Sequence, residues 1–178
     1  MNKISLILLL VFCLTACDSK NKSEINNSKS VFELGENGID TVLILLNSKE
    51  VLVLRTDFSS DSEWEYICDM ISESGKDLGF KPYVEFLNRR EFKGLKQKDI
   101  LNMLCYYKHP LIFIVDNITI ENKEYPILCV DLYDELGASF RVIPSEIWSV
   151  ENNLSIANMD FLDFMNATDK DEIFRGYK

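Results

Sequence analysis

The stretch VLVLRTDFSSDSEWEYICDMISESG, residues 51–75, decides the fold of this chain. It opens with a short apolar run rich in β-branched residues, a length that suits a buried strand better than a helix. Ser60 and Glu63 then have the spacing of a helix capping box, and apolar residues follow at helical spacing. The stretch therefore predicts a buried strand followed by an amphipathic helix that ends near Gly75.

The same alternation of strand and helix signals continues along the chain. Two crossover helices between apolar strands imply an α/β or α+β domain, with helices packed on a mixed β-sheet. Short turns in the second half predict antiparallel pairing there. The order of elements in the first half is thioredoxin-like, but no Cys-x-x-Cys motif accompanies it. Further strands are expected at 42–46, 82–87, 111–115, 127–132 and 139–143, and further helices around 100–105, over 145–154 and after Asp160.

The first seventeen residues have the layout of a secretory signal peptide. Lys3 precedes an apolar stretch over 6–14, which is too short to cross a hydrocarbon core that needs about 20 residues. Leu14 to Cys17 resembles the lipobox of bacterial lipoproteins. The resemblance implies that Cys17 is the lipid-modified residue and that palmitate is among its acyl chains. The alternative is an ordinary signal peptide with a chance cysteine.

Three regions follow from this interpretation. We expect a signal peptide over 1–16, a lipidated polar tether over 17–38 and a globular domain over 39–178. Acylated Cys17 would hold the protein in the cell membrane through the lipid bilayer, with the domain facing the periplasm or extracytoplasmic space. The sequence leaves open whether that membrane is the inner or the outer one.

The charge of the chain is strongly negative. It contains 19 Lys and Arg against 29 Asp and Glu, a formal net charge of -10. Removal of residues 1–16 takes away only Lys3, which leaves 18 cations against 29 acids and a charge of -11. Such a surface works against binding nucleic acid and favours a basic or neutral protein partner.

Five strings in the domain stand out: RTDF at 55–58, DLYDE at 131–135, FRVIPSE at 140–146, WSVENNLSIANMDF at 148–161 and FRG at 174–176. Together they resemble an uncharacterised bacterial family, domain of unknown function 6924. The resemblance covers about residues 47–178 and implies no activity. The signal, the tether and the first strand resemble additions to the family domain.

An unusual polar segment lies near the C-terminus. Asn152, Asn153 and Asn158 are poor helix formers, and with Glu151 they could form a fixed polar constellation for a ligand. The alternative is that their amides tie together the turn between two helices.

Charged residues follow two of the predicted strands. Arg55 and Asp57 come after the first, and Asp116 follows the strand at 111–115. Because strand ends line the ligand crevice of open α/β sheets, these carboxylates could meet there as an acid and a base or as ligands of Mg²⁺ or Ca²⁺. The alternative is that each aspartate is a turn or cap residue.

An acidic hairpin is expected around residues 131–141. An aspartate, Asp131 or Asp134, could form an ion pair with Arg141 across it. The alternative is that its tip, with Tyr133 and Glu135, is an acidic recognition loop.

Structural roles are expected for the histidine and the cysteines of the domain. His109 is the only histidine, and no Gly-x-Ser-x-Gly motif accompanies it. Cys68, Cys105 and Cys129 lie at apolar positions, so the sequence allows either one disulfide or buried free thiols.

These observations favour a non-catalytic binding module on a membrane-anchored lipoprotein. No catalytic or metal-ligating residue and no cofactor is assigned. The alternative is a carboxylate-based hydrolase or a divalent-metal enzyme that uses Asp57 and Asp116.

Overall fold

The computed structural model describes residues 47–104 and 107–177. The predicted signal peptide, the tether, the strand expected at 42–46 and the lipidation residue Cys17 all lie outside the described residues. Cys105 does as well.

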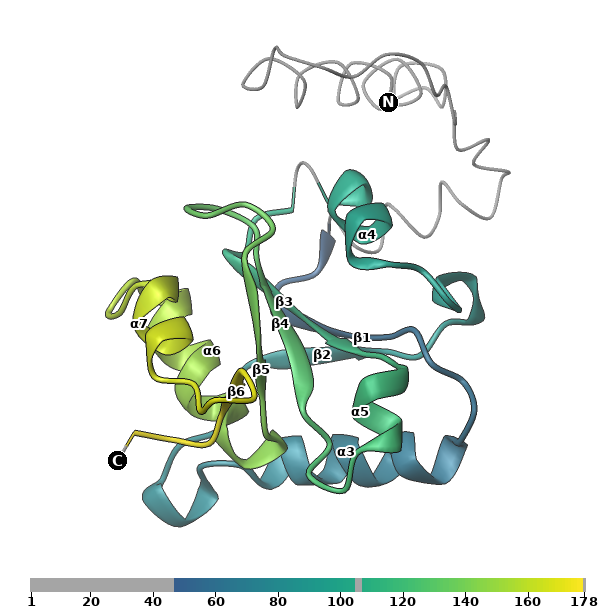
Figure 1. Cartoon of the computed structure of the whole chain (residues 1–178), viewed down its shortest axis with the longest axis horizontal. Helices are drawn as coiled ribbons and strands as arrows, with labels where there is room; N and C mark the ends of the chain where they lie inside the picture. The colour runs from purple at the N-terminus through teal and green to yellow at the C-terminus, as the bar shows by residue number, and fades with distance from the viewer. Residues whose placement is uncertain (1–46, 105–106, 178) are drawn as a thin grey trace.

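A six-stranded mixed sheet forms the centre of the domain (Figure 1). The strands lie in the order β2-β1-β3-β4-β5-β6, and β4 is antiparallel to both of its neighbours while the other adjacent pairs are parallel. This confirms the α/β prediction of a mixed sheet whose second half contains antiparallel pairs. The strands are β1 (Val51–Arg55), β2 (Val84–Leu87), β3 (Leu111–Val115), β4 (Ile127–Asp131), β5 (Ser139–Val142) and β6 (Ile173–Phe174).

Helices cover both faces of the sheet. Residues of α3, α6 and α7 belong to the larger apolar cluster on one face, and α4 packs on the other face. None of the helices in the described part of the chain is long and apolar enough to cross a membrane. The helices are α3 (Asp61–Glu73), α4 (Gln97–Met103), α5 (Asn117–Glu121), α6 (Ile147–Ser155) and α7 (Phe161–Asn166), with short 3-10 turns η2 (Lys76–Leu78), η3 (Arg90–Phe92) and η4 (Pro144–Glu146).

The predicted cap of α3 is present. The Ser60 hydroxyl accepts the backbone N–H of Glu63 at 3.2 Å, which satisfies one of the free donors at the start of the helix. Trp64, Ile67 and Ile71 are buried, so the helical spacing of apolar residues in the sequence corresponds to the face that packs on the sheet.

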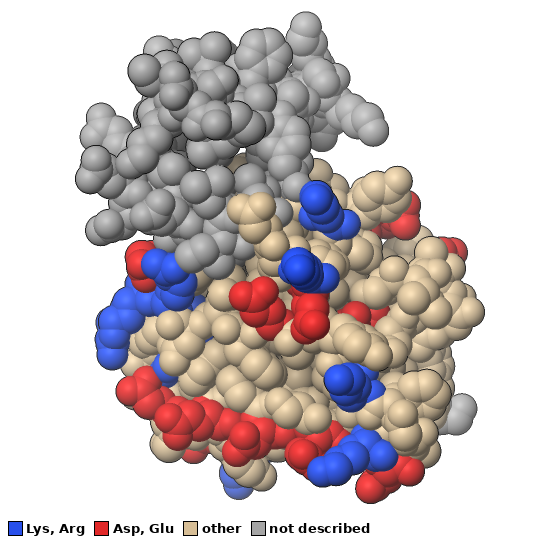
Figure 2. All heavy atoms as spheres, turned by 180° about the vertical axis from the view of Figure 1, so that it is seen from behind, with Lys and Arg blue, Asp and Glu red and all other residues tan. Residues whose placement is uncertain are grey.

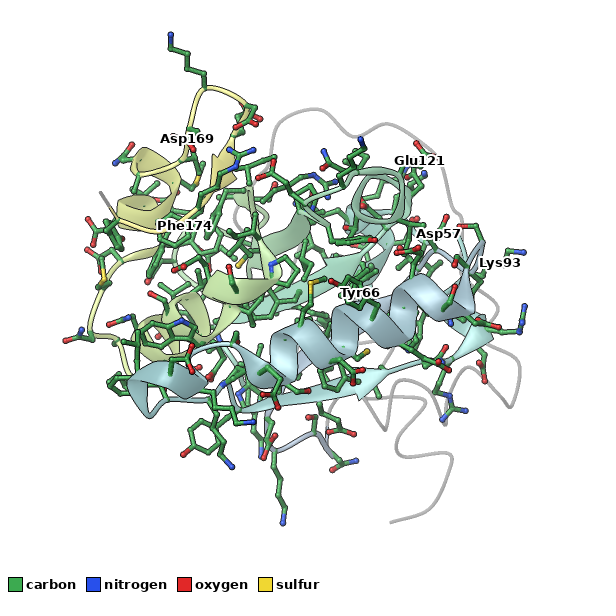
Figure 3. The ribbon with its side chains drawn as sticks, turned by 90° about the horizontal axis from the view of Figure 1, so that it is seen from below. Asp57, Tyr66, Lys93, Glu121, Asp169 and Phe174 are labelled. Carbon is green, nitrogen blue, oxygen red and sulfur yellow. The ribbon has the colours of Figure 1, made fainter. Side chains whose placement is uncertain are left out.

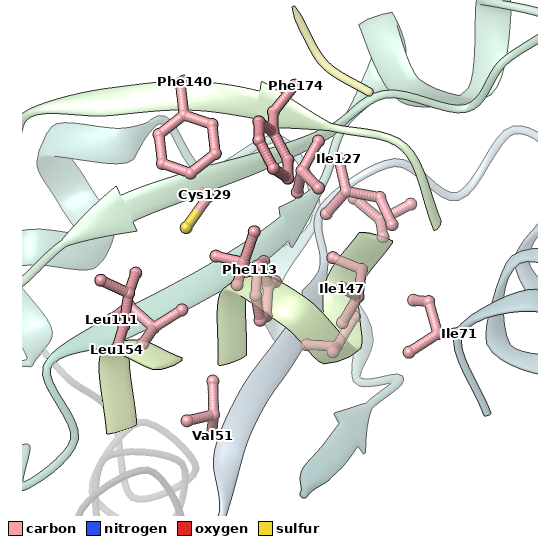
Figure 4. Packing of buried hydrophobic residues seen from close by; sticks show 14 of the residues in the cluster. Val51, Ile71, Leu111, Phe113, Ile127, Cys129, Phe140, Ile147, Leu154 and Phe174 are labelled. Atoms are coloured by element: carbon pink, nitrogen blue, oxygen red, sulfur yellow. The ribbon is translucent and has the colours of Figure 1, made fainter. Parts of the chain in front are cut away.

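The core lies on both sides of the two central strands. Every residue of β1 and β3 is buried, as expected for central strands with both faces covered. Side chains alternate between the two faces, so Val51 and Phe113 join one cluster while Leu52 joins the other. Figure 4 shows α6 packing against the larger cluster through Ile147 and Leu154.

Two elements were not predicted. The helix α5 lies between β3 and β4, and it interrupts the otherwise confirmed order of strand, helix, strand, helix, strand, strand. The strand β6 has only two residues and pairs with β5 near the C-terminus. Elements of five and two residues are too short to show a periodic pattern in a sequence.

Candidate functional site

Arg55, at the end of β1, is fully buried and bonded on all sides. Its exposed fraction is 1%. Its Nε donates to the carbonyl of Asp57 at 2.8 Å and its Nη2 to the carbonyl of Ser60 at 3.0 Å. Its Nη1 pairs with the Asp61 carboxylate at 2.8 Å, and the guanidinium lies 4.4 Å from the centre of the Phe58 ring. These contacts fasten the loop between β1 and α3 and leave Arg55 no free direction toward a ligand.

The aspartates at the strand ends also make local bonds. Asp57 accepts the backbone N–H of Ser59 at 2.8 Å and the Ser59 hydroxyl, which closes a turn before α3. Asp116 caps α5 by accepting the N–H of Thr119 at 3.0 Å and its hydroxyl at 3.1 Å. Figure 3 shows Asp57 near the start of α3, at the end of the molecule away from Phe174.

Asp116 and Arg141, both candidate residues, form a largely buried ion pair. Arg141 Nη2 lies 2.7 Å from Asp116 Oδ2, and Nη1 donates to Oδ1 at 3.1 Å and to the carbonyl of Pro126 at 2.8 Å. Burial on its own would raise the pKa of Asp116, but the bonds from Arg141 and Thr119 outweigh it and hold that pKa below its usual value. The pair joins the end of β3 to β5.

The ion pair expected across the hairpin is wrong, because Arg141 pairs with Asp116 and not with Asp131 or Asp134. Arg141 lies opposite Leu128 in the β4–β5 register, three residues away from Asp131. An odd separation along a strand places the two side chains on opposite faces of the sheet. Asp131 is instead 2% exposed, and its two carboxylate oxygens accept the backbone N–H groups of Tyr133 at 2.9 Å and Glu135 at 2.6 Å.

The polar segment of α6 bonds mainly to backbone. Asn152 Nδ2 donates to the carbonyls of Trp148 at 2.8 Å and Lys81 at 3.1 Å. Asn153 Nδ2 donates to the carbonyl of Ser149 at 2.8 Å, and Asn158 Nδ2 donates to the Asn153 side chain at 2.7 Å. These bonds correspond to the structural alternative stated for the segment.

Glu151 is a buried carboxylate that connects α6 to β2. It is 2% exposed, and its oxygens accept the N–H of Tyr83 at 2.9 Å and the hydroxyl of Ser155 at 2.8 Å. Burial raises the pKa of Glu151, and these bonds oppose the rise only in part.

Two of the candidate segments meet in one cavity, which we call the hairpin cleft. It has a volume of about 280 Å³ and lies between the β4–β5 hairpin and the turn from α6 to α7. The cleft brings Asp131 together with the segment that follows Glu151. Its lining residues are Lys108, Pro110, Asp131, Tyr133, Asp134, Leu154, Ser155, Ala157, Met159, Asp160 and Phe161.

The hairpin cleft combines negative charge with exposed apolar surface. Asp134 of the hairpin and Asp160 before α7 are exposed acids that line it, and Lys108 is the cation among the lining residues. Tyr133 is 79% exposed and Ile156, beside the lining residue Ala157, is 75% exposed. Large apolar side chains exposed beside a cleft are typical of interaction surfaces.

The backbone of the same cleft contains a strained residue. Ala157 has a φ of 53°, in the left-handed region that residues with a Cβ rarely adopt. Strain of this kind persists where the surrounding structure fixes it and is common at functional sites.

Two thiols lie among the described residues, those of Cys68 and Cys129. Cys68 and Cys129 form no disulfide, which agrees with the free-thiol alternative for these two. Burial, with Asp69 adding to it, raises the pKa of Cys68 to about 12, and burial raises the pKa of Cys129 as well. Neither forms an appreciable thiolate at neutral pH. The His109 ring packs against Tyr107 at 5.1 Å between centroids.

Among residues 47–104 and 107–177, no group of three His, Cys, Asp or Glu side chains is placed to hold a metal ion.

Sequence reasoning missed a second and larger cavity, which we call the α3 cleft. It has a volume of about 670 Å³ and is formed by three segments that are distant in sequence. Glu146 and Trp148 line this cleft. Both belong to the sequence strings that carry the family resemblance, but no motif spacing in those strings indicated a site at either residue. The lining residues are Tyr66, Met70, Glu73, Ser74, Gly75, Lys76, Asp77, Leu78, Lys123, Glu124, Tyr125, Ile143, Pro144, Ser145, Glu146 and Trp148.

Comparison with protein families gives a match over residues 50–177, to a family described as a domain of unknown function (DUF6924). The chain belongs to this family. The match begins just before β1 and ends after β6, so it covers the whole described sheet. Membership confirms the resemblance drawn from the sequence strings and brings no assigned activity with it.

Comparison with solved structures gives partial matches. Two structures of prolyl-tRNA synthetase from Cryptosporidium parvum, one with L-proline and AMP and one with halofuginone and AMPPNP, each match with 18% identity and a TM-score of 0.44. Each match covers 61% of this chain and 21% of the synthetase, so the chain spans about a fifth of that protein. No curated protein matches the chain.

Proposed function

We propose that the protein is a membrane-anchored lipoprotein whose acidic domain is a non-catalytic binding module for a basic segment of an extracytoplasmic protein. The observation that carries the proposal is the hairpin cleft, where the exposed Tyr133 and Asp134 of the hairpin meet Met159 and Asp160 of the turn from α6 to α7. Tyr133 and Met159 supply apolar contact area, and Asp134 and Asp160 supply partners for Lys or Arg side chains.

The wider charge distribution supports a basic partner. Asp61, Glu65, Asp69 and Glu73 follow one another at i, i+4 spacing on α3, and all four are exposed. Figure 2 shows a row of acidic side chains along the lower edge of the molecule, where α3 runs. Like charges at this spacing each cost a helix about 0.2–0.5 kcal/mol. The resulting field would speed the approach of a cationic partner.

The proposed anchor places the domain close to a membrane. Acylation of Cys17, with a tether over 17–38, would allow the domain to reach a few tens of ångströms from the bilayer, at about 5–6 Å times the square root of the number of tether residues. The negative surface would keep the domain from adhering to anionic lipids and leave its clefts accessible.

Photo-crosslinking in intact cells tests the binding role. A photo-reactive amino acid is placed at Tyr133, in the hairpin cleft, and at Ile118, an exposed apolar residue on α5, as the matched control. We expect a discrete crosslinked protein from position 133 and not from 118. Equal crosslinking at both positions, or none at 133, would contradict the proposal.

A charge substitution tests the chemistry of the partner. Asp134→Lys should abolish the crosslink from position 133, whereas Glu121→Lys, an exposed charge reversal on α5, should leave it unchanged. A crosslink that survives Asp134→Lys would exclude a basic partner in this cleft.

Metabolic labelling tests the anchor. An alkyne analogue of palmitate should label the full chain and not Cys17→Ser, which should leave the membrane fraction. Labelling that persists in the variant would exclude Cys17 as the lipid site.

The alternative, a carboxylate-based or divalent-metal enzyme, would require Asp57 and Asp116 to release Ser59 and Arg141. A thermal-shift screen of the full chain with Mg²⁺, Ca²⁺ and Mn²⁺ separates the two functions. A metal that binds the native state raises its melting temperature, and Asp116→Asn would abolish that rise.

A further inference from the structure

We propose that the α3 cleft binds an organic ammonium group, with the Glu146 carboxylate as its anionic partner and aromatic side chains as its walls. The volume of about 670 Å³ lies within the range of about 300–1,000 Å³ that is usual for small-molecule sites. The cleft shares no lining residue with the hairpin cleft, so this site goes beyond the proposed function and stands apart from it.

Glu146 is the central observation. It occupies the N-cap position of α6, but its side chain makes no capping bond. The side chain is half-buried, its carboxylate oxygens keep access to solvent, and no described residue donates a hydrogen bond to them or pairs with them. Burial raises the pKa of Glu146, as expected for a carboxyl group that has lost water without gaining a partner. An ammonium group would supply both the charge and the hydrogen bonds.

Two glycines allow the backbone to pack closely against Glu146 and Trp148, the side chains that would bind the ligand. A Cβ at Gly176 would lie 3.3 Å from the Glu146 carboxyl carbon, and Gly176 has a φ of 93°. A Cβ at Gly75 would lie 2.6 Å from Cγ of Trp148, and Gly75 has a φ of 75°. The left-handed backbone favours glycine at both positions, and at Gly75 the close approach excludes a Cβ as well. The backbone therefore packs directly against the carboxylate and the indole.

The aromatic walls are held in place by their neighbours. Trp148 stacks on Phe80 with ring centroids 5.1 Å apart and an interplanar angle of 15°. Tyr66 and Tyr125 meet edge to face at 5.7 Å, and the Tyr125 hydroxyl donates to Glu63. Tyr66 projects from α3, the helix seen from below in Figure 3. Aromatic faces attract cations, so fixed rings around a carboxylate form a preorganised site for an ammonium group.

The other charges of the cleft do not neutralise Glu146. Lys76 pairs with Glu73 at 2.6 Å, and Glu124 pairs with Arg175 at 2.7 Å. Lys123 lines the cleft and is exposed, but it makes no ion pair with Glu146. A ligand cation would therefore not have to displace a protein cation from the Glu146 carboxylate.

The ammonium group could belong to a small free amine or to a lysine side chain of a peptide. Both sources present the same chemistry to Glu146 and the rings. They differ in whether amide groups accompany the amine, and the probes below separate them.

The experiment uses intrinsic fluorescence of the full chain in detergent. The chain has two tryptophans, and Trp64→Phe leaves Trp148 at the cleft wall as the reporter. Phenethylamine is titrated against 2-phenylethanol, which has the same ring and no charge. We expect the amine to bind about tenfold more tightly, because a charge-assisted hydrogen bond to a half-buried carboxylate contributes that much. Equal affinities would overturn the proposal.

Substitutions locate the binding group. Glu146→Gln keeps the shape of the side chain and should remove the preference for the amine, while Glu121→Gln on α5 should retain it. Tyr66→Leu, at an exposed wall position, should weaken the amine about two- to fivefold through loss of a cation–π contact. The Tyr66 variant tests the site independently if Glu146→Gln does not fold. An amine preference that survives Glu146→Gln in a folded protein, or is unchanged by Tyr66→Leu, would overturn the assignment.

The source of the amine is decided by a second pair of probes, N-acetyl-lysine methylamide and its Nε-acetylated form. Tighter binding of the lysine derivative than of phenethylamine, lost on Nε-acetylation, assigns the cleft to a lysine side chain. Tighter binding of phenethylamine assigns it to a free amine. No binding of any of these amines to the parent chain would overturn the proposal.

Discussion

The carboxyl ends of β1 and β3 and the α3 cleft contain the same kinds of side chain but use them in opposite ways. At the strand ends, the polar atoms of Arg55 and Asp116 form hydrogen bonds and ion pairs with other groups of the protein. In the α3 cleft, Glu146 is half-buried with no described partner. A crevice position in the topology therefore does not make a site, and a half-buried charge beside a cavity with no protein partner is the better indicator.

The strongest test of this comparison is Arg55→Met, which keeps the length of the side chain and removes its donors. We expect the free energy of unfolding to fall by about 3 kcal/mol, because two loop carbonyls lose buried partners. Urea denaturation measures the change. Asp61→Asn, at the exposed partner of Arg55, should cost less than about 1 kcal/mol. Equal effects of the two substitutions would show that the ion pair, and not the loop carbonyls, accounts for the role of Arg55.

Asp116→Asn isolates the charge of the second bonded group, since asparagine is also a good helix N-cap. We expect a loss of about 1–2 kcal/mol at pH 7 from the weakened bonds to Arg141. The pKa of Asp116 is depressed in the fold, so its contribution is complete above the unfolded value near 3.8 and disappears as the pH falls through the folded value. The variant should therefore lose less stability on acidification than the parent, as urea unfolding at pH 7 and pH 3 would measure. Parallel pH profiles would contradict the ion pair.

Glu151 lies between these two cases, because its carboxylate has hydrogen-bond partners in the protein and burial still raises its pKa. A raised pKa means that the fold disfavours the ionised form, so stability is greatest below the unfolded value near 4.5 and falls as the pH rises through the folded value. Glu151→Gln should remove this fall and change stability at pH 7 by less than about 1 kcal/mol, since its carbonyl can still accept from Tyr83. Glu151→Ala, which leaves that N–H unpaired, should cost about 2 kcal/mol. Thermal unfolding from pH 4 to pH 8 distinguishes them, and an unchanged pH profile for Glu151→Gln would contradict the assignment.

The smallest stability effect is expected in the hairpin cleft. Asp134→Asn should change the free energy of unfolding by less than about 0.5 kcal/mol, because the side chain is exposed and makes no bond to a described residue. The same substitution should weaken the crosslink from position 133. A large loss of stability would show that Asp134 has a structural role. The hairpin cleft would then resemble the bonded strand ends and not a ligand site.

Local patterns predicted most of the regular structure. The apolar run at Val51 and the Ser60 cap predicted β1 and α3, because both signals act within a few residues of sequence. Asp160 predicted the start of α7 in the same way. The short elements α5 and β6 were missed, since β6 forms only where the C-terminal segment returns to pair with β5.

The sites depended on contacts that the sequence does not encode locally. Asp131 and Arg141 are close in sequence, but the register of β4 and β5 separates them and brings Arg141 to Asp116. The β4–β5 hairpin and the α6–α7 turn are distant in sequence, and they form one cleft only because the fold brings them together.

The sequence by itself determined the strand and helix signals, the negative charge and the family resemblance, because these reside in residue types and short spacings. Only the tertiary structure decided which polar atoms are satisfied and which remain free. That outcome depends on strand register and on segments that meet across the fold, as Gly176 meets Glu146. Such a meeting leaves a carboxylate available to a ligand where it covers part of the side chain and supplies no donor.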